Sequence, residues 1–439
     1  MALREQTYFL RNLRGSFTSI GALLPTSRYA ARAMASEFAR RHGARTVLEA
    51  GPGTGAITAA IVEQMRPGDR LVLCELNDEF VAYLRQRIDN APAFRRVRGQ
   101  ITLIHGDVTQ LDRAQHFDAI VSAIPFTNLP AEVVEGILET YREILKPGGT
   151  LTYIEYAFFR ALKRRFASAE QRDMSEAASV VLDRYLHAHE FRRDTVVRNV
   201  PPAWIHHLRL QEPSPADALT LAPLEHNHRI QLTSSMAVAS DALPWIAGLF
   251  AIGRVLPRPL RRLIWLLAAI IGAFFRDPVR HVAPDPGVAY AAADGRVLSI
   301  ERVHDERFGD SEWLRIAVFL SLLDVHINRS PIAGKVEKLV QEEGGYAAAD
   351  SADAEHNQAL YTMIEGASGP CVVAQRAGLV ARRIVNWSQP GELLAQGDRY
   401  GLIRFGSRTD VYLPAEQWQA IISVGDRVAG GETVIARRT

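Results

Sequence analysis

The sequence is poor in cysteine and nearly balanced in charge. Its 439 residues include only Cys74 and Cys371, which lie far apart in separate predicted domains. So few cysteines argue against a disulfide framework and fit a reducing, cytosolic compartment. The formal net charge of +2 gives no overall signature of polyanion binding, and no nucleic-acid partner is expected.

Long hydrophobic segments are also missing. The N-terminus lacks the apolar core of a signal peptide. Residues 242–253 and 263–275 are apolar, but both runs fall short of the ~20 residues that a bilayer-spanning helix needs. Arginines and prolines lie between them. We expect residues 242–275 to form a membrane-associating hairpin or in-plane anchor with its basic turn at the lipid headgroups. The alternative is a pair of buried core helices.

Other segments are compatible with an anionic membrane surface. Residues 1–14 have the pattern of an amphipathic helix, which either packs on a core or lies on anionic lipid. Basic clusters at Arg40-Arg41 and Lys163-Arg164-Arg165 suit the same surface, although solvated surface charge explains them equally well.

The remaining composition is that of a globular protein of two or three domains, with 47% apolar and 23% charged residues. A helix is expected at 27–41, and strand-like and helical segments then alternate up to residue 155. The expected strands are 46–50, 71–75, 101–105, 117–122 and 150–155, and the expected helices are 56–65 and 131–145. This alternation predicts a doubly wound, Rossmann-like parallel sheet.

A glycine-rich turn follows the first of these strands, and acids end the next two. The turn, Gly51-Pro52-Gly53-Thr54-Gly55, is a weak signal alone because several nucleotide-binding folds share it. Glu75 ends the second strand, where an acid can hold ribose hydroxyls, and Asp107 follows the third. Each acid alone equally fits a helix cap or a solvated strand end.

Together these features resemble the class I S-adenosylmethionine-dependent methyltransferases over about residues 20–210. The resemblance implies a domain at 1–210 in which the glycines let the backbone approach the cofactor. It also implies that Glu75 binds the ribose and that Asp107 lies near the adenine. The implied cofactor-binding residues are Glu49, Gly51, Gly53, Gly55, Glu75 and Asp107.

The methyl acceptor is indicated by two further patterns. Ala123-Ile124-Pro125-Phe126 resembles the base-binding motif of adenine-N6 methylases, but that motif opens with Asn or Asp. Ala123 lacks the polar group that orients an exocyclic amine, which argues against an RNA dimethylase. The better resemblance is to bacterial phospholipid N-methyltransferases. It is carried by Gly21-Ala22, by Pro25-Thr26-Ser27-Arg28, and by Asn199-Val200-Pro201-Pro202-Ala203.

The C-terminal part has a different pattern. Residues 211–241 are rich in Pro, Ser and Ala and are expected to be an interdomain linker. Over 276–439 a mostly β domain is expected, with short strands at 314–321, 379–385, 401–405 and 409–413. The last residues have the turn spacing of barrel-sandwich modules that carry biotin or lipoate. No lysine stands in that turn, so only the β architecture is inferred.

The stretch Arg404-Phe405-Gly406-Ser407-Arg408 carries a second resemblance. A Gly-Ser pair between β-prone residues is usually a turn. With its flanks, however, it resembles the self-cleavage site of phosphatidylserine decarboxylases, and the match to their short form covers about residues 242–439. The resemblance implies that the Ser407 hydroxyl attacks the carbonyl of Gly406. The resulting ester eliminates and leaves a pyruvoyl group at the start of the second fragment. Glycine suits a position where a nucleophile must reach the backbone carbonyl.

The same resemblance assigns two further residues. His326, in the segment Asp324-Val325-His326, matches the histidine of decarboxylation, although a lone histidine in a β protein is usually structural. Asp294 matches the acid that the family links to self-cleavage. The second histidine of the long-form family is replaced by Arg329, as in other short forms, so the base for processing stays open. The implied catalytic residues are Ser407, His326, Asp294 and Gly406, and no metal ligand is assigned.

The two resemblances encode consecutive steps. The sequence predicts a bifunctional enzyme that decarboxylates phosphatidylserine with a pyruvoyl group and then N-methylates phosphatidylethanolamine with S-adenosylmethionine. Its two cleaved chains are expected to stay associated at the cytoplasmic face of an anionic membrane. The alternatives are a decarboxylase with a non-catalytic or differently specific methyltransferase domain, and a lipid-binding scaffold. Intact Asp294, His326 and Gly406-Ser407 argue against the scaffold.

Overall fold

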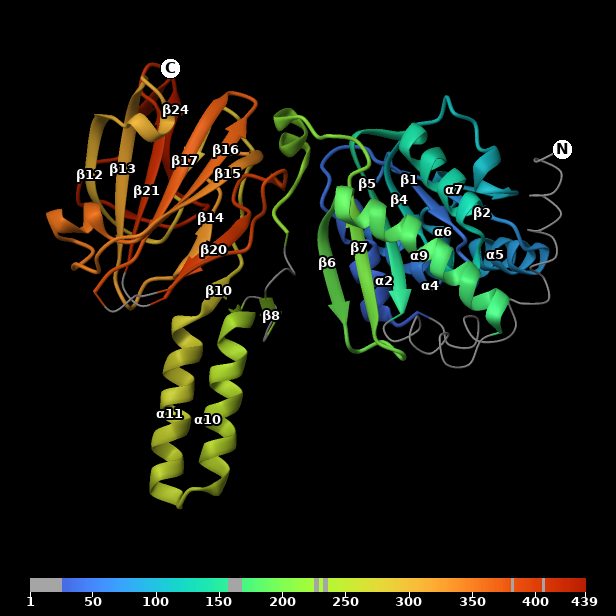
Figure 1. Cartoon of the computed structure of the whole chain (residues 1–439), viewed down its shortest axis with the longest axis horizontal. Coiled ribbons are helices and arrows are strands. Elements are labelled where there is room, and N and C mark those ends of the chain that lie inside the picture. Colours follow the sequence, from blue (N-terminus) through green and yellow to red (C-terminus); the bar gives the residue numbers. More distant parts are fainter. Residues whose placement is uncertain (1–25, 157–167, 225–228, 232–235, 380–382, 405–406) are drawn as a thin grey trace. The chain divides into compact units, whose positions relative to one another are not determined.

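The computed structural model describes residues 26–156, 168–224, 229–231, 236–379, 383–404 and 407–439. The chain divides into two compact units, Met1–Pro213 and Ser214–Thr439, which run from blue to green and from green to red in Figure 1. The expected helix at 1–14 and the motifs Gly21-Ala22 and Lys163-Arg164-Arg165 lie outside the described residues.

The first unit is built on a seven-stranded sheet with the order β3-β2-β1-β4-β5-β7-β6. Strands β1 to β5 pair in parallel, whereas β7 is antiparallel to both β5 and β6. The predicted parallel sheet is confirmed, and its two antiparallel strands were not predicted. The strands are β1 (Thr46–Ala50), β2 (Arg70–Glu75), β3 (Ile101–His105), β4 (Phe117–Ser122), β5 (Leu145–Tyr156), β6 (Glu190–Val196) and β7 (Ala203–Leu208).

Helices cover both faces of this sheet. One apolar core joins the sheet to α7 and α9, and another joins its other face to α2, α3, α4 and α6. The predicted helix at 27–41 is interrupted at Ala35, which separates α2 from α3. The helices are α2 (Arg28–Met34), α3 (Ser36–Ala39), α4 (Ala56–Gln64), α5 (Asp78–Asn90), α6 (Pro92–Arg95), α7 (Ala131–Ile144) and α9 (Ala169–His189), with the 3-10 turns η2 (Arg98–Gln100), η3 (Val108–Gln110) and η4 (Phe126–Asn128).

The second unit is rich in β-structure, as predicted. Its main sheet is antiparallel with the order β19-β15-β16-β17-β21-β13-β12-β23, and smaller sheets have the orders β14-β20-β18, β11-β24-β22 and β10-β9-β8. The main-sheet strands are β12 (Gly295–His304), β13 (Glu312–Leu320), β15 (Gly334–Glu342), β16 (Ala359–Gly366), β17 (Gly369–Arg376), β19 (Leu393–Leu394), β21 (Ser407–Pro414) and β23 (Arg427–Val428). The others are β8 (Arg229–Gln231), β9 (Met236–Ala239), β10 (Arg276–Pro278), β11 (Val288–Tyr290), β14 (Ile327–Arg329), β18 (Ile384–Asn386), β20 (Arg399–Ile403), β22 (Trp418–Ala420) and β24 (Val434–Arg438).

Two expectations for this unit differ from the structure. The stretch 211–241, expected as a linker, contains η5 (Pro215–Thr220), β8 and β9, and Leu221 packs in an apolar cluster with Leu393. The strand expected at 379–385 is present only as β18, and residues 380–382 lie outside the described part. Leu379 is exposed, so the apolar residue that suggested a longer strand does not face a core.

The apolar runs form a helical hairpin, α10 (Leu243–Val255) and α11 (Arg258–Phe274). Figure 1 shows the two helices side by side, and in both views the hairpin extends away from the strands of its unit. Gly253 makes the close approach possible, because a Cβ there would lie 2.5 Å from Trp265 Nε1. The helical hairpin is confirmed, and its membrane association stays a prediction. None of the helices within the described ranges has both the length and the apolarity needed to cross a bilayer.

Most large apolar side chains of the hairpin are exposed, which argues against the alternative of a buried helix pair. Val255, Leu263 and Leu266 are 83%, 62% and 58% exposed. Leaving a large apolar side chain in water costs about 1.5–3 kcal/mol relative to burial. The basic residues Arg254, Arg258, Arg261 and Arg262 lie at the tip, around the turn between the helices.

Candidate active sites

The turn after β1 has a backbone that glycine adopts most readily. Gly51, Gly53 and Gly55 have φ angles of +69°, +54° and +76°, in the left-handed region that side chains disfavour. A Cβ at Gly53 would meet no atom within 4 Å. Open space therefore adjoins this backbone at the carboxyl ends of the strands, where α/β sheets bind ligands.

The structure brings the predicted acids to this same edge. Glu75 Oε2 accepts a hydrogen bond from the Gly53 amide at 2.9 Å, which ties the end of β2 to the glycine turn. Asp107 follows β3 and accepts a hydrogen bond from the Thr109 amide at 2.9 Å, as the cap of η3. Glu49 is fully buried in β1, and this burial raises the pKa of its carboxyl group to about 8. The residues present therefore fit a nucleoside-containing cofactor.

Two segments that suggested a phospholipid N-methyltransferase meet in space. The Ser27 amide donates a hydrogen bond to Asn199 Oδ1 at 2.9 Å, across 172 positions of sequence. The Arg198 guanidinium lies 5.3 Å from the ring centre of Tyr29. Ala203 pairs with Tyr156, the last residue of β5. These segments therefore lie at the same carboxyl edge of the sheet as the glycine turn.

The Ala123–Phe126 turn follows β4 at this edge. The Ala123 amide donates to Ala50 O at 2.9 Å, so the turn starts beside the end of β1. Phe126 is buried and contacts Tyr153 edge-on, with ring centres 5.4 Å apart. Its ring belongs to the apolar core and is not presented to a base. This packing agrees with the sequence argument against a base methylase.

A buried polar row near the end of β5 was not predicted. His206 Nδ1 lies 2.5 Å from Glu190 Oε1, and His206 Nε2 lies 3.7 Å from Glu155 Oε2. The His206 ring stacks on Tyr153 with centres 4.9 Å apart. The three residues come from three different strands, so no local sequence motif predicts that they lie together. The only sequence signal is the pair His206-His207 within an otherwise apolar strand.

In the second unit, Ser407 is the first residue of β21. It pairs with Leu320, the last residue of β13, and it is fully buried. Within the described part of the chain, no group makes a hydrogen bond to its Oγ. Its hydroxyl is therefore not committed to the sheet. Gly406, the predicted partner in cleavage, lies outside the described residues.

His326 lies just before β14, at the end of the connection from β13. Its carbonyl oxygen accepts the Ile403 amide at 3.3 Å. Its Nδ1 lies 2.9 Å from Asp324 O, and since a carbonyl only accepts, the neutral ring carries its hydrogen on Nδ1 and its lone pair on Nε2. Burial lowers the pKa of His326 to about 4. The histidine is therefore neutral at physiological pH.

Asp294 lies in the turn before β12. It accepts hydrogen bonds from Arg280 Nη2 at 2.6 Å and from the Gly430 amide at 2.7 Å. Burial raises the pKa of its carboxyl group, and Arg280 opposes this shift. Asp294 is therefore held firmly by groups on two other segments, and it lies close enough to Arg329 and Asp324 for electrostatic interaction.

Arg329 replaces the second histidine of the long-form family. Its Nη2 lies 3.0 Å from Asp277 Oδ1, and Arg399 Nη1 lies 2.5 Å from Asp277 Oδ2. Burial lowers the pKa of Arg329 to about 10, so the guanidinium stays charged at neutral pH. It pairs with a buried carboxylate and does not have the lone pair that a processing base needs.

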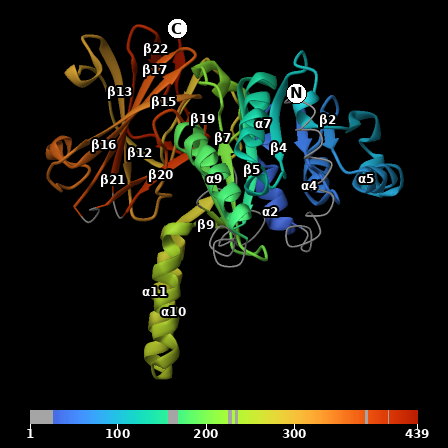
Figure 2. The ribbon, with the colours of Figure 1, turned by 45° about the vertical axis from the view of Figure 1, so that its right-hand side comes forward.

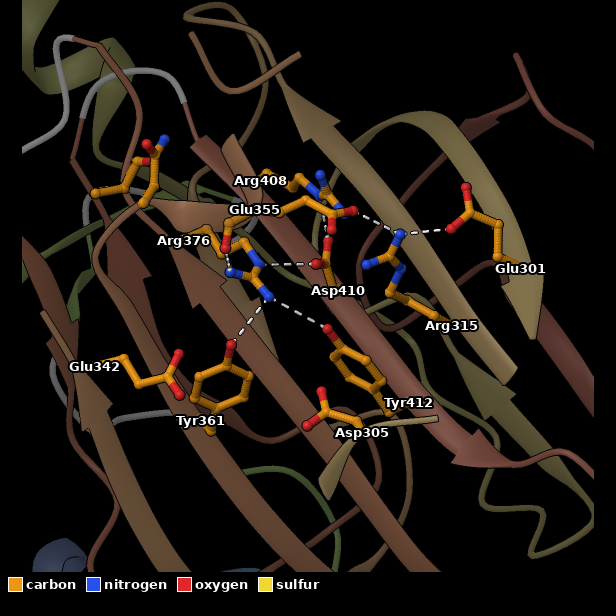
Figure 3. Close-up of polar contacts among 12 residues, drawn as sticks. Glu301, Asp305, Arg315, Glu342, Glu355, Tyr361, Arg376, Arg408, Asp410 and Tyr412 are labelled. Atoms are coloured by element: carbon orange, nitrogen blue, oxygen red, sulfur yellow. Dashed lines mark hydrogen bonds and ion pairs between the residues drawn. The ribbon is translucent and has the colours of Figure 1, made fainter. Parts of the chain in front are cut away.

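The strand that starts at Ser407 is fixed by a buried ion cluster (Figure 3). Asp410, fully buried, accepts from Arg408 Nε at 2.6 Å and from Arg376 Nε at 2.9 Å. Arg376 also donates to the hydroxyls of Tyr361 and Tyr412 at 3.0 and 3.3 Å. Because side chains alternate along a strand, this cluster and the Ser407 side chain lie on opposite faces of β21.

Comparison with known proteins agrees with this division. A methyltransferase domain model matches residues 47–149, and a phosphatidylserine decarboxylase model matches residues 267–436. The phosphatidylserine decarboxylase proenzyme of Desulfotalea psychrophila is 40% identical over 212 residues, which are 47% of this chain and 99% of that protein. The Burkholderia mallei and Symbiobacterium thermophilum proenzymes are each 42% identical over 39% of this chain, and the matches cover 80% and 84% of those proteins.

Solved methyltransferases resemble the chain more distantly. A precorrin-6y C5,15-methyltransferase from Geobacter metallireducens has a TM-score of 0.32 and 14% identity, over 43% of this chain and 90% of that one. A glycopeptide N-methyltransferase has a TM-score of 0.33 and 18% identity, over 44% and 91%. From its fold and the matching models, the chain is a methyltransferase domain followed by a β-rich domain. Through that second domain it belongs to the phosphatidylserine decarboxylase family.

Proposed function

We propose that the chain is a bifunctional enzyme of phospholipid synthesis at the cytoplasmic face of the membrane. The second unit decarboxylates phosphatidylserine by means of a pyruvoyl group made from Ser407. The first unit transfers methyl groups from S-adenosylmethionine to phosphatidylethanolamine. The observation that carries the proposal is that, in a phosphatidylserine decarboxylase family member, Ser407 pairs with the last residue of β13 while the Ile403 amide donates to the carbonyl oxygen of His326.

Self-cleavage begins with the Ser407 hydroxyl. Its Oγ is buried without a hydrogen bond from the described residues, which supports a role as nucleophile. It attacks the carbonyl carbon of Gly406, and the peptide C–N bond is replaced by a C–O ester. Loss of the Ser407 α-proton then breaks the Cβ–O bond, so that Gly406 leaves as a carboxylate. The dehydroalanine left at position 407 tautomerises to an imine, which water hydrolyses to the pyruvoyl group and ammonia. The chain is then divided into 1–406 and 407–439. Because β21 pairs with β13 on one edge and β17 on the other, the two fragments stay associated.

His326 manages the proton of decarboxylation. The pyruvoyl group supplies a carbonyl that condenses with the substrate amine and an electron sink for the loss of CO2. The serine headgroup enters with a protonated amine, which must lose its proton before it can react. His326 Nε2 accepts a proton while Asp324 O holds Nδ1–H. The imidazolium then returns the proton to the carbon that has lost CO2.

The first unit supplies the methylation site. Gly53 leaves open space for the cofactor, while Glu75 and Asp107 lie at the neighbouring strand ends. S-adenosylmethionine, when bound, supplies an electrophilic methyl group. The junction of Ser27 with Asn199 at the same edge supports the assignment of a phospholipid acceptor, because these segments carry the resemblance to phospholipid N-methyltransferases.

An acceptor amine also has to lose a proton before it can attack the methyl group. Glu155 lies next to the last residue of β5, at the carboxyl edge. His206 connects it to Glu190, whose side chain is 22% exposed. We assign Glu155 as the acceptor of that proton, with His206 lying between the two carboxylates, 3.7 Å from Glu155 Oε2 and 2.5 Å from Glu190 Oε1.

The hairpin attaches the enzyme to its substrate surface. Its exposed leucines and isoleucines gain about 1.5–3 kcal/mol each on leaving water, and each arginine adds about 1 kcal/mol near anionic lipid. Arginines at the tip are costly in the hydrocarbon, which favours an in-plane orientation with the tip at the headgroups. A bilayer containing anionic phospholipid is therefore the proposed partner of residues 242–275.

Intact mass spectrometry of the purified protein, with gel analysis, tests the proposal. The expected result is two fragments, 1–406 and 407–439, the second bearing a pyruvoyl group in place of its serine. The masses of the two fragments show both where the chain is cut and whether the pyruvoyl group is present. A single uncut chain that still releases CO2 from phosphatidylserine would refute the proposal.

A further inference from the structure

Both ends of the α10–α11 hairpin contact the segments that carry the proposed decarboxylase chemistry. At the start, Asp241 of η6 (Ser240–Ala242) lies with Oδ1 3.3 Å from Arg404 Nη2. Arg404 is the last described residue before Ser407. At the end, the ring of Phe274 lies on the imidazole of His326, with centres 4.2 Å apart. We call the two ends of the hairpin, at Asp241 and at Phe274, its feet. The first foot therefore contacts the chain that leads to the proposed cut, and the second contacts the proposed catalytic histidine.

Further contacts tie the same elements together. The Arg276 guanidinium, two residues after the hairpin, donates a hydrogen bond to Leu323 O in the segment that leads to His326. Ala242 and Phe274, at the two feet, share an apolar cluster with Val325 and Leu402. Val325 precedes His326, and Leu402 lies in β20, which leads to Arg404. The hairpin base and both reactive segments thus form one small core.

We infer that the hairpin is a positioning element for both chemical steps, acting through Phe274 on His326 and through Asp241 on Arg404. The inference rests on the proposed function of the second unit and adds a connection to it. The hairpin, which is proposed to lie on lipid, thus also sets the positions of His326 and of the chain before Ser407. Phe274 does this by covering one face of the imidazole and excluding water. Asp241 does it by restraining the chain before Ser407, while Arg408 and Asp410 restrain the chain after it.

Phe274 and Phe275 provide a matched pair of variants. Both rings are buried in the same cluster, but the contact with His326 is made by Phe274. The pH dependence of decarboxylation, on phosphatidylserine in detergent micelles, is the readout. The charged groups that act on His326 are Asp324 and Arg276, and both remain in each variant.

The expected result is specific to one ring. In Phe274→Ala, water reaches the imidazole, and the acidic limb of the rate profile moves from near pH 4 towards 6.5, the ordinary pKa of histidine. In Phe275→Ala, the limb stays in place although the protein loses similar stability. Phe274→Leu, which remains apolar, gives a smaller shift in the same direction and serves if the alanine variant does not fold. An unshifted profile in the Phe274 variants, or equal shifts in both positions, overturns the inference.

The other foot is tested by charge reversal. Asp241→Arg and Arg404→Asp singly place like charges together, and each slows self-cleavage about tenfold or more. The double variant restores the pair and brings the cleavage rate back to within about threefold of the wild type. Cleavage is followed on gels after cell-free synthesis, and thermal unfolding is measured for every chain. Single variants that cleave at the wild-type rate, or a double variant slower than both, overturn the inference. A wild-type chain that does not cleave contradicts the proposed function instead.

Discussion

Ser407 lies directly opposite Leu320 in the antiparallel pairing of β21 with β13. The peptide bond proposed to be cut thus adjoins the last residue pair between these two strands, and β17 is paired on the other side of β21. Covalent connection at this point is not what keeps β21 in place. The strand is held by two neighbours and by the buried ion cluster at Arg408 and Asp410.

The first prediction concerns processing. Ser407→Ala leaves no hydroxyl to attack, and we expect this variant to stay full length. Wild-type fragments 1–406 and 407–439 should elute together on size exclusion and separate only in denaturant. The measurement is a gel of the eluted peak with and without denaturant. Fragments that separate in native buffer would contradict the account of β21.

The second prediction concerns the ion cluster of Figure 3. Asp410→Asn removes the carboxylate that bridges two buried guanidinium groups, and we expect a loss of about 3–5 kcal/mol in the free energy of unfolding. Glu301→Gln is the control, because Glu301 is 46% exposed and its pair with Arg315 contributes about 1 kcal/mol or less. Urea unfolding in a Ser407→Ala background, where every chain is uncut, gives both values. Equal losses would show that the cluster is not specially important.

The third prediction concerns independence of the two activities. Gly53→Val places a branched side chain in a left-handed backbone position facing the cofactor space, so methylation should be lost while decarboxylation continues. His326→Ala should stop CO2 release but leave methylation of added phosphatidylethanolamine. Radiolabel transfer and CO2 release are measured on the same preparations. Loss of both activities in either folded variant would count against two separate sites.

The fourth prediction follows from Glu49. Because its pKa is raised from 4.5 to about 8, its stabilising contribution is complete below pH 4.5 and is lost as pH rises towards 8. At pH 7 the carboxyl group is protonated, and a cationic cofactor bound over the turn favours its ionised form. Binding of S-adenosylmethionine should therefore release a proton and tighten between pH 7 and 8. Calorimetry in two buffers of different ionisation enthalpy measures the release, which Glu49→Gln should abolish.

The fifth prediction concerns the hairpin surface. Replacing the exposed Leu263, Leu266 and Ile270 by serine removes apolar contacts while sparing both feet. Flotation with anionic vesicles should fall strongly, whereas decarboxylation of a water-soluble, short-chain phosphatidylserine should persist. Val180→Ser, on the exposed side of α9, is the control and should float like the wild type. Undiminished flotation of the triple variant would place the membrane contact elsewhere.

The sequence predicted those parts of the fold whose signal is local. Strands 46–50 and 117–122 were found at their observed bounds because each is a short apolar run between turn residues. The edge strand β6 was missed because it is rich in charged residues and only half buried. The stretch 211–241 seemed structureless in composition because its short elements depend on partners such as Leu393 in β19.

The candidate sites divide in the same way. The glycine turn and Ser407 have sequence patterns, since backbone geometry and the cutting reaction restrict the residues allowed there. The contact of Phe274 with His326, and the row from Glu155 to Glu190, join residues far apart in the chain. Only the tertiary fold brings them together, and no single segment encodes these contacts.

The fragment 407–439 contributes β21 to the middle of the main sheet, β23 to its edge, and β22 and β24 to another sheet. None of these strands has a place until the rest of the unit has folded around it. In the proposed function, assembly therefore comes first and the cut second, and a molecule that later loses the pyruvoyl group has no serine at position 407 from which to make another. On this proposal each copy of the enzyme makes its pyruvoyl group once, after folding, and a copy that loses the group stays inactive.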